Sequence, residues 1–357
     1  MSKWPRRRLR TTPRRLKSGA TSKRTFRRKS KADRRKRAGG KRRSARRPLR
    51  RAVLPIVAEK SPQEAEEQVT DRFDEGFDEG YREGLYEGGE RLLEKRLPPN
   101  LIFPDLTLED FLAEGIAALR YRGIPILQPV DVYEELERML TAKQPYSLVR
   151  LGDGELLTLA QEKVMSIEEV RQKGAFLVYA GIDVPDLQAS EELASCIRSA
   201  SLVGVPLSRS PHFQPLLFAV WRAYGIHPHT LRLTSSTVNY SLNDEGYMMR
   251  LLAGRRVLVI GDLADPLAQN LMGRGVRIAG TVSPVRGVSD FPRVVDIAAM
   301  YEFDLALVSA GIAAVPICVH LANRTGKVAI DFGHLANRIT GLTGPFVRHP
   351  LPAAAIE

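Results

Sequence analysis

The residues best suited to chemistry lie in the stretch 147–155, Ser-Leu-Val-Arg-Leu-Gly-Asp-Gly-Glu. An apolar run of strand character ends there in a glycine-flanked turn that carries two carboxylates, Asp153 and Glu155, and an apolar helical pattern follows. Carboxylates at the carboxyl end of a parallel strand can bind a divalent cation. Gly152 and Gly154 allow a sharp turn, and the amides that open the next helix favour an anion beside the metal. The stretch predicts a metal and phosphate site, and an ordinary Gly-Asp-Gly surface turn is the alternative.

Further candidates lie immediately before this turn and far downstream. Arg150 can neutralise a phosphate through bidentate hydrogen bonds, or it can form a surface ion pair. The turn that contains Ser309 and Gly311 follows an apolar strand and opens a helix, so its amides can also meet phosphate. Asp331 and His334 end the last expected strand, where they would suit a base that deprotonates an acceptor hydroxyl, or a donor-binding pair. A histidine that caps a helix or bonds to the backbone is the alternative for His334.

Two ordered motifs resemble those of the GT-D-type glycosyltransferases. Residues 150–155, Arg-Leu-Gly-Asp-Gly-Glu, resemble the Arg-aromatic-Gly-Asp-Gly-Glu signature of that family. Residues 304–311 and 329–334 resemble its closing segment, in which a strand, a glycine turn and a helix precede a strand that ends in Asp-x-Gly-His. The similarity covers roughly residues 105–340. The chain departs from the pattern at Leu151, where an aromatic is common, and at 310–313, where other members have a Gly-Pro-Thr-Ala-like turn.

The resemblance implies a specific activity and cofactor. In that family the Asp-x-Glu pair binds the metal of a nucleotide-sugar donor, which assigns Asp153 and Glu155 as ligands of Mn²⁺ or Mg²⁺. The donor implied is a UDP-sugar, and the acceptor a glycan or a protein. The residues alone predict only a metal-bound diphosphate, whose charge the cation would stabilise as it departs.

The rest of the chain from about residue 105 alternates helical and strand patterns. Helices are expected over 108–121 and 130–141. Strands are expected over 147–151, 202–207, 231–234, 256–260, 276–282, 304–309 and 327–331. Such alternation predicts a Rossmann-like α/β domain over residues 105–345, with a largely parallel sheet covered by helices on both faces. The strand at 256–260 is followed by a single glycine, so the Gly-x-Gly-x-x-Gly dinucleotide pattern fails and a nicotinamide enzyme is disfavoured.

The charge is concentrated at the amino terminus. Residues 1–51 hold 25 lysines and arginines and one acidic residue, whereas residues 52–357 hold 29 basic and 40 acidic residues, a net charge of −11. The first segment cannot bury enough apolar surface to fold, so we expect a disordered basic tail, followed by a linker over 52–65. The tail predicts a polyanionic partner: nucleic acid, an anionic membrane surface, or an acidic polymer of the envelope or spore.

Residues 66–97 contain a tetrapeptide repeat with glycine at 76, 80, 84 and 88 and an apolar residue at 73, 77, 81 and 85. Both sets recur every fourth residue, which predicts a helix. Four glycines cost about 1 kcal/mol each relative to alanine, so this helix needs a partner. The repeat resembles the glycine-repeat helix of flagellar export stator proteins. A homodimeric helix pair is the preferred interpretation, and a frayed, solvated spacer is the alternative.

The cysteine and hydropathy patterns bear on location. Cys196 and Cys318 lie in apolar helical contexts without metal-ligand spacing, which is typical of buried, reduced thiols. The amino terminus has no hydrophobic signal region, and no apolar run approaches membrane-spanning length. We therefore expect a cytoplasmic protein, located in the cytosol, at the inner face of the membrane or in the spore.

Together these features predict a metal-dependent glycosyltransferase carried behind a glycine-repeat helix and a basic tail. The main alternative is a non-catalytic envelope or spore-coat protein that keeps the fold and binds polyanions through its tail. A nucleic-acid-binding protein is a third possibility, which the negative charge of residues 52–357 opposes.

Overall fold

The computed structural model describes residues 76–342, so the predicted basic tail and linker lie outside the described residues. Its contacts divide the chain into two units, one that ends at Leu97 and one that begins at Pro98. The predicted α/β domain lies in the second unit. No helix among residues 76–342 has the length and apolar character needed to cross a membrane.

Seven parallel strands form the centre of the second unit. They are β1 (Tyr146–Arg150), β2 (Leu202–Val205), β3 (Leu233–Ser235), β4 (Arg256–Gly261), β5 (Arg277–Val282), β6 (Leu305–Ser309) and β7 (Val328–Asp331). Their order across the sheet is β3-β2-β1-β7-β6-β4-β5. Strand β1 pairs with β2 on one side and with β7 on the other, where Leu148 lies opposite Ile330. The predicted largely parallel sheet is confirmed.

Buried side chains alternate between the two faces of the sheet, as the two-residue period of a strand requires. In β4, Leu258 and Ile260 join one hydrophobic core, whereas Val257 and Val259 join a second core on the opposite face. Strands buried on both faces are typical of parallel sheets, because the connecting helices cover each side. This explains why the strands are nearly continuous apolar runs in the sequence.

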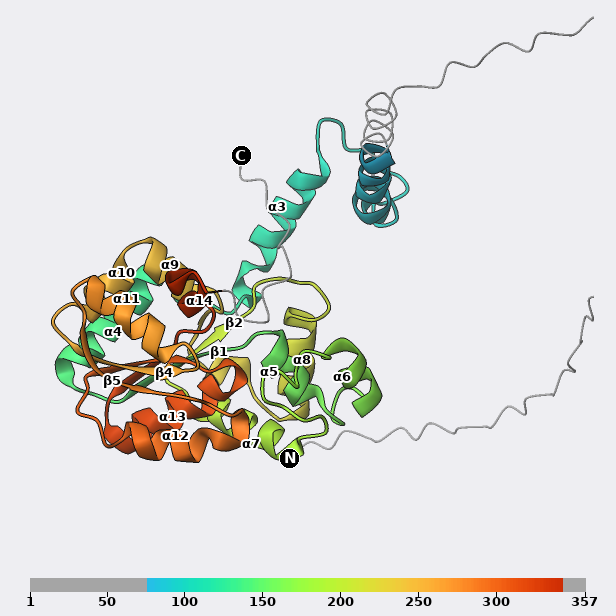
Figure 1. The fold of residues 1–357 in the computed structure, drawn as a ribbon. Helices are drawn as coiled ribbons and strands as arrows, with labels where there is room; N and C mark the ends of the chain where they lie inside the picture. Colours follow the sequence, from blue (N-terminus) through green and yellow to red (C-terminus); the bar gives the residue numbers. More distant parts are fainter. Residues whose placement is uncertain (1–75, 343–357) are drawn as a thin grey trace, which may run out of the picture. The chain divides into compact units, whose positions relative to one another are not determined.

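Each core is closed by its own set of helices (Figure 1). The first core is covered by α5 (Asp153–Ala160), α6 (Ile167–Lys173), α7 (Leu187–Ser199), α8 (Gln214–Ala223), α12 (Phe291–Ala298) and α13 (Ala314–Thr325). The second is covered by α4 (Pro129–Ala142), α9 (Val238–Asp244), α10 (Tyr247–Leu252), α11 (Ala264–Gly273) and α14 (Leu335–Thr340). Helices on both faces give the Rossmann-like architecture predicted from the sequence.

The second unit begins with an exposed segment before the sheet. Helix α3 (Leu108–Leu119) starts at Thr107, which forms a capping box with Asp110, and it contains no buried residue. A short 3-10 turn, η2 (Arg120–Arg122), continues it. The structure thus has a helix where the sequence predicted one over 108–121, but this helix adds nothing to the two cores.

The first unit is helical over residues 76–94. Residues 76–85 are α-helical, and η1 (Tyr86–Glu90) and α2 (Arg91–Glu94) continue the helix, with a π-helical turn in η1. Added Cβ atoms at Gly76, Gly80, Gly84 and Gly88 would meet no atom within 4 Å. The glycine stripe of the repeat is therefore open along this helix.

Candidate functional site

The carboxyl ends of the central strands converge where the strand order changes direction. From β1 the chain adds β2 and β3 outward on one side, and it later returns on the other side to place β7 beside β1. Ligands of open α/β sheets bind outside the carboxyl ends of strands at such a switch point. The loops after β1, β6 and β7 all reach this edge, and they contain the residues predicted from the sequence.

The loop after β1 is shaped by the start of helix α5. Gly152 occupies the N-cap position, and its amide donates to Glu155 Oε2 at 2.7 Å. Asp153 is the first helical residue, is exposed, and accepts a hydrogen bond from the Gly154 amide at 2.9 Å through Oδ1. The two carboxylates therefore differ: Asp153 faces solvent, whereas Glu155 is partly buried and closes the first helical turn.

Gly154 brings the loop after β1 against the turn after β6. A Cβ added at Gly154 would lie 3.2 Å from Ile312 Cδ1, tighter than ordinary packing allows. Ile312 belongs to the 3-10 turn η5 (Gly311–Ala313), which leads directly into α13. The Asp153–Glu155 turn and the Gly311 turn, separated by about 160 residues in the sequence, are thus in contact, as the predicted site requires.

Arg150 and Asp331 form a buried ion pair between β1 and β7. Their side chains are 15% and 5% exposed, and Arg150 Nη2 donates to Asp331 Oδ1 at 2.9 Å. The Arg150 amide donates to Asp331 Oδ2 at 3.2 Å, and Nε donates to the Asp331 carbonyl at 3.1 Å. Nη1 donates to the Ser236 carbonyl and to Asn239 Oδ1 at 3.0 and 3.3 Å. The sequence left open whether Arg150 binds phosphate or forms a surface ion pair. In the structure it forms an ion pair, and that pair is buried.

The loop after β7 fits around this pair. Gly333 has a φ of +53°, and an added Cβ would lie 1.8 Å from Arg150 Nη2. The Gly333 carbonyl accepts a hydrogen bond from Ser309 Oγ at 2.8 Å, which joins the ends of β6 and β7. His334 follows at the N-cap position of α14, where it is exposed and makes no side-chain capping bond. The sequence left open whether His334 acts in the site or caps a helix. Its side chain forms no capping hydrogen bond to α14.

Asn239 has a structural role at the site that the sequence did not indicate. It lies in a polar stretch of the sequence, but it is fully buried. Its Nδ2 donates to the Phe332 carbonyl at 2.9 Å, while its Oδ1 accepts from Arg150. Asn239 therefore holds the loop after β7 in place. Its polar sequence context carries no signal of this buried role.

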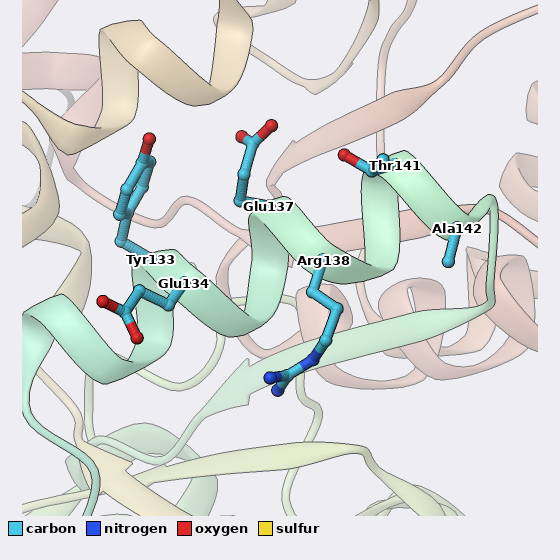
Figure 2. Close-up of a pocket in the computed structure, with 6 residues that line it drawn as sticks. All are labelled: Tyr133, Glu134, Glu137, Arg138, Thr141 and Ala142. Atoms are coloured by element: carbon cyan, nitrogen blue, oxygen red, sulfur yellow. The ribbon is translucent and has the colours of Figure 1, made fainter.

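A shallow depression elsewhere on the domain has no relation to these residues. It is lined by Tyr133, Glu134, Glu137, Arg138, Thr141 and Ala142 (Figure 2). All six belong to helix α4, and the side chains in Figure 2 project from that one helix. No predicted site residue lines it, so the edge of the sheet remains the candidate site.

The electrostatics of the site centre on Glu155. Burial raises the pKa of Glu155 to about 7, and the nearby negative charge of Asp331 adds to this rise. The hydrogen bond from the Gly152 amide and the positive charge of Arg150 act in the opposite direction. Burial also raises the pKa of Asp331, and the Arg150 guanidinium opposes that rise. A cation bound beside Glu155 would therefore stabilise the ionised carboxylate.

This raised pKa predicts how stability depends on pH. Between its ordinary pKa and about 7, Glu155 binds a proton more tightly in the folded than in the unfolded protein, so stability falls as pH rises through this window. We expect urea unfolding in EDTA to show a loss on the order of 1 to 3 kcal/mol between about pH 5 and pH 8. Glu155→Gln should remove this loss, and an unchanged pH slope in that variant would contradict the assignment.

Comparison with known proteins identifies the domain. A family model of the GT-D fold-like domain matches residues 127–339, which include all seven strands and amount to more than half of the chain. A search of curated proteins found no match.

Three solved structures are similar to part of the chain. One is a glycosyltransferase of the domain of unknown function 1792 from Streptococcus sanguinis, with 17% identity over 60% of this chain and 83% of that one, and a TM-score of 0.42. Another is described as domain of unknown function 1792 with a distinct glycosyltransferase fold, with 16% identity over 63% and 83%, and a TM-score of 0.42. A selenomethionine-substituted structure of the same domain has 16% identity over 60% and 79%, and a TM-score of 0.39.

Proposed function

Since the chain belongs to the GT-D fold-like domain family, we propose that it is a glycosyltransferase that moves a sugar from a UDP-sugar to a glycan or protein acceptor. The observation that carries this proposal is the contact between two turns at the switch point of the sheet. One turn presents Asp153 and Glu155, and the other, around Gly311, opens helix α13. A cation site beside backbone amides suits a nucleoside diphosphate.

The residues of the first turn fit a hard divalent cation. Mg²⁺ and Mn²⁺ prefer oxygen ligands and are often held by one or two carboxylates together with substrate phosphates. Asp153 is exposed, and its Oδ2 makes no hydrogen bond within residues 76–342. Glu155 lies two residues on, with one oxygen committed to the Gly152 amide. In the proposal these two residues hold Mn²⁺ or Mg²⁺, which would neutralise charge on the departing diphosphate.

The protein's other groups take separate parts in the proposal. The amides of the turn at Gly311 bind phosphate oxygens, because this turn leads directly into α13 and a helix N-terminus favours anions. Exposed His334 is the candidate base for the acceptor hydroxyl. Both oxygens of Asp331 accept hydrogen bonds from Arg150, so Asp331 positions the loop after β7 rather than exchanging a proton.

A donor screen tests the proposed activity. The purified chain is tested with Mn²⁺ against a panel of nucleotide sugars, by thermal shift and by release of the nucleoside diphosphate. We expect a UDP-sugar to raise the melting temperature only when metal is present, and to be slowly hydrolysed. A protein that binds no member of the panel with or without metal would favour the non-catalytic envelope or spore-coat alternative.

The basic tail should act separately from this chemistry. Deleting residues 1–51 removes 25 basic residues. Because contacts between such residues and polyanions release counterions, binding of the full chain to anionic vesicles or nucleic acid should fall steeply with salt and should vanish in the truncated protein. Donor hydrolysis should be retained. A markedly lower melting temperature after truncation would instead show that the tail is part of the fold.

The glycine stripe should set the oligomeric state. Replacing Gly80 and Gly84 by leucine raises helix propensity by about 1 kcal/mol per residue, and side chains fit there because added Cβ atoms meet nothing within 4 Å. A helix pair that needs close backbone approach would be blocked. We expect the double variant to lose dimer by light scattering while its helical content is retained. The same mass for wild type and variant would support a solvated spacer.

A further inference from the structure

A second group of potential metal ligands lies between helices α7 and α13, which pack against each other (Figure 1). Glu192 and Cys196 are four residues apart on α7, so they project from the same face of that helix. His320 lies on α13, near the middle of the helix. The ligand atoms of these three side chains all lie within 4.8 Å of one another, and the three form the only such group found within residues 76–342.

Short contacts already join the three side chains. His320 Nε2 lies 2.7 Å from Glu192 Oε1, and Cys196 Sγ donates to the same oxygen at 3.2 Å. Around a tetrahedral Zn²⁺ with ordinary bond lengths, the corresponding N···O and S···O separations are about 3.3 and 3.5 Å. A metal ion would therefore need the N···O and S···O atoms to separate by about 0.6 and 0.3 Å, which side-chain rotation can supply.

The burial of the three side chains defines a half-open site. Cys196 is 2% exposed, whereas the side chains of Glu192 and His320 are 28% and 42% exposed. The ring of Phe291 stacks on His320 with 4.7 Å between ring centroids and 18° between planes, which fixes the orientation of the imidazole. The Cys196 thiol is therefore the buried member of the group, whereas the side chains of Glu192 and His320 reach solvent.

We propose that Glu192, Cys196 and His320 form a binding site for Zn²⁺ or a similar soft divalent cation, separate from the glycosyltransferase site. One thiolate, one imidazole and one carboxylate are the ligand types that Zn²⁺ uses, while Mg²⁺ and Mn²⁺ prefer all-oxygen sites. Binding replaces the Cys196 S–H bond by an S–metal bond and releases the proton to solvent. Water completes the fourth position, and the ion links α7 to α13.

Little in the amino-acid sequence indicated this site. It predicted that Cys196 is a buried, free thiol, and the structure confirms this. The spacing of the cysteines lacks a metal motif because the third ligand, His320, comes from a helix 128 residues away. Only the Glu-x-x-x-Cys spacing on α7 was visible, and that spacing alone is common on helices.

Titration of the metal-free full chain with Co²⁺ tests the proposal, because a cobalt–thiolate bond gives a charge-transfer band that oxygen ligands do not produce. We expect this band in wild type, its removal by equimolar Zn²⁺, and a rise in melting temperature with Zn²⁺. Cys196→Ala should abolish the band. His320→Gln, at a half-exposed position, should weaken Co²⁺ binding at least about tenfold.

Two control variants separate this site from its neighbours. Cys318→Ala removes the other free, buried thiol, and Asp153→Asn removes a ligand of the proposed donor site; both should keep the cobalt–thiolate band. Absence of the band in wild type, or its persistence in Cys196→Ala, would overturn the proposal. A band lost in Cys318→Ala but kept in His320→Gln would do the same. None of these outcomes depends on glycosyltransferase activity.

Discussion

We expect Asp153→Asn and Glu155→Gln each to abolish Mn²⁺-dependent UDP binding and donor turnover while leaving the domain folded. Both changes keep the size of the side chain and remove the negative charge that holds a hard cation. We expect UDP affinity in Mn²⁺ to fall by more than about a hundredfold, since loss of a partner outside the ligand set already costs 10- to 100-fold. Calorimetric titration of UDP with and without Mn²⁺ measures this loss.

Stability should respond differently from binding. Glutamine at 155 retains an oxygen that can accept the Gly152 amide bond, so the helix start is preserved. Removing the charge of Glu155 also relieves its repulsion with Asp331 in the metal-free protein. We therefore expect melting temperatures in EDTA to stay level or to rise slightly. A large drop, with no effect of metal on wild type, would mean that Glu155 has only a structural role.

The chain offers a matched control for each variant. Glu169 occupies the same capping position in α6 that Glu155 occupies in α5, and it accepts from the Ser166 amide at 3.1 Å. Asp265 lies in the first turn of α11, after β4, and is exposed like Asp153. Glu169→Gln and Asp265→Asn should leave UDP binding unchanged. Full UDP binding by the Asp153 and Glu155 variants would remove the support for a metal-dependent donor site.

Features of the site formed by residues adjacent in the chain could be predicted from the sequence, whereas contacts between distant residues could not. The turn at 152–155 was predictable because the strand, the glycines and the helix that form it are adjacent in the chain. The parallel sheet was predictable because its strands, buried on both faces, are apolar runs separated by helical patterns. The turn and the parallel sheet together predict that the candidate residues meet at the carboxyl edge of the sheet.

The partners of individual side chains were not predictable in the same way. Arg150 finds its acceptors on Asp331 and near Ser236, 181 and 86 residues away. Its location just before the metal motif suggested a phosphate ligand, because a guanidinium exposed at a strand end is free to bind one. Only the register between β1 and β7 decides that this guanidinium is directed into the protein.

Because the Arg150–Asp331 ion pair is buried, breaking it should strongly destabilise the domain. Arg150→Ala leaves the Asp331 carboxylate, 5% exposed, without its charged partner, and removal of one partner from a buried pair typically costs about 3–5 kcal/mol. We expect a loss of this size in urea unfolding, together with weaker UDP binding because the loop after β7 loses its anchor. The double variant Arg150→Met, Asp331→Leu should recover much of the stability but not the binding.

An ion pair at the opposite edge of the sheet provides the comparison. Arg256 and Asp304 join the beginnings of β4 and β6 with the same geometry: Nη2 lies 2.9 Å from Oδ1, and the Arg256 amide donates to Oδ2 at 2.9 Å. Their side chains are 32% and 35% exposed, so Arg256→Ala should cost no more than about 1 kcal/mol. If Arg150→Ala were equally mild yet abolished UDP binding, Arg150 would be a phosphate ligand after all. The division of roles between a buried anchoring pair, Arg150 and Asp331, and a separate metal-ligand pair, Asp153 and Glu155, would then be wrong.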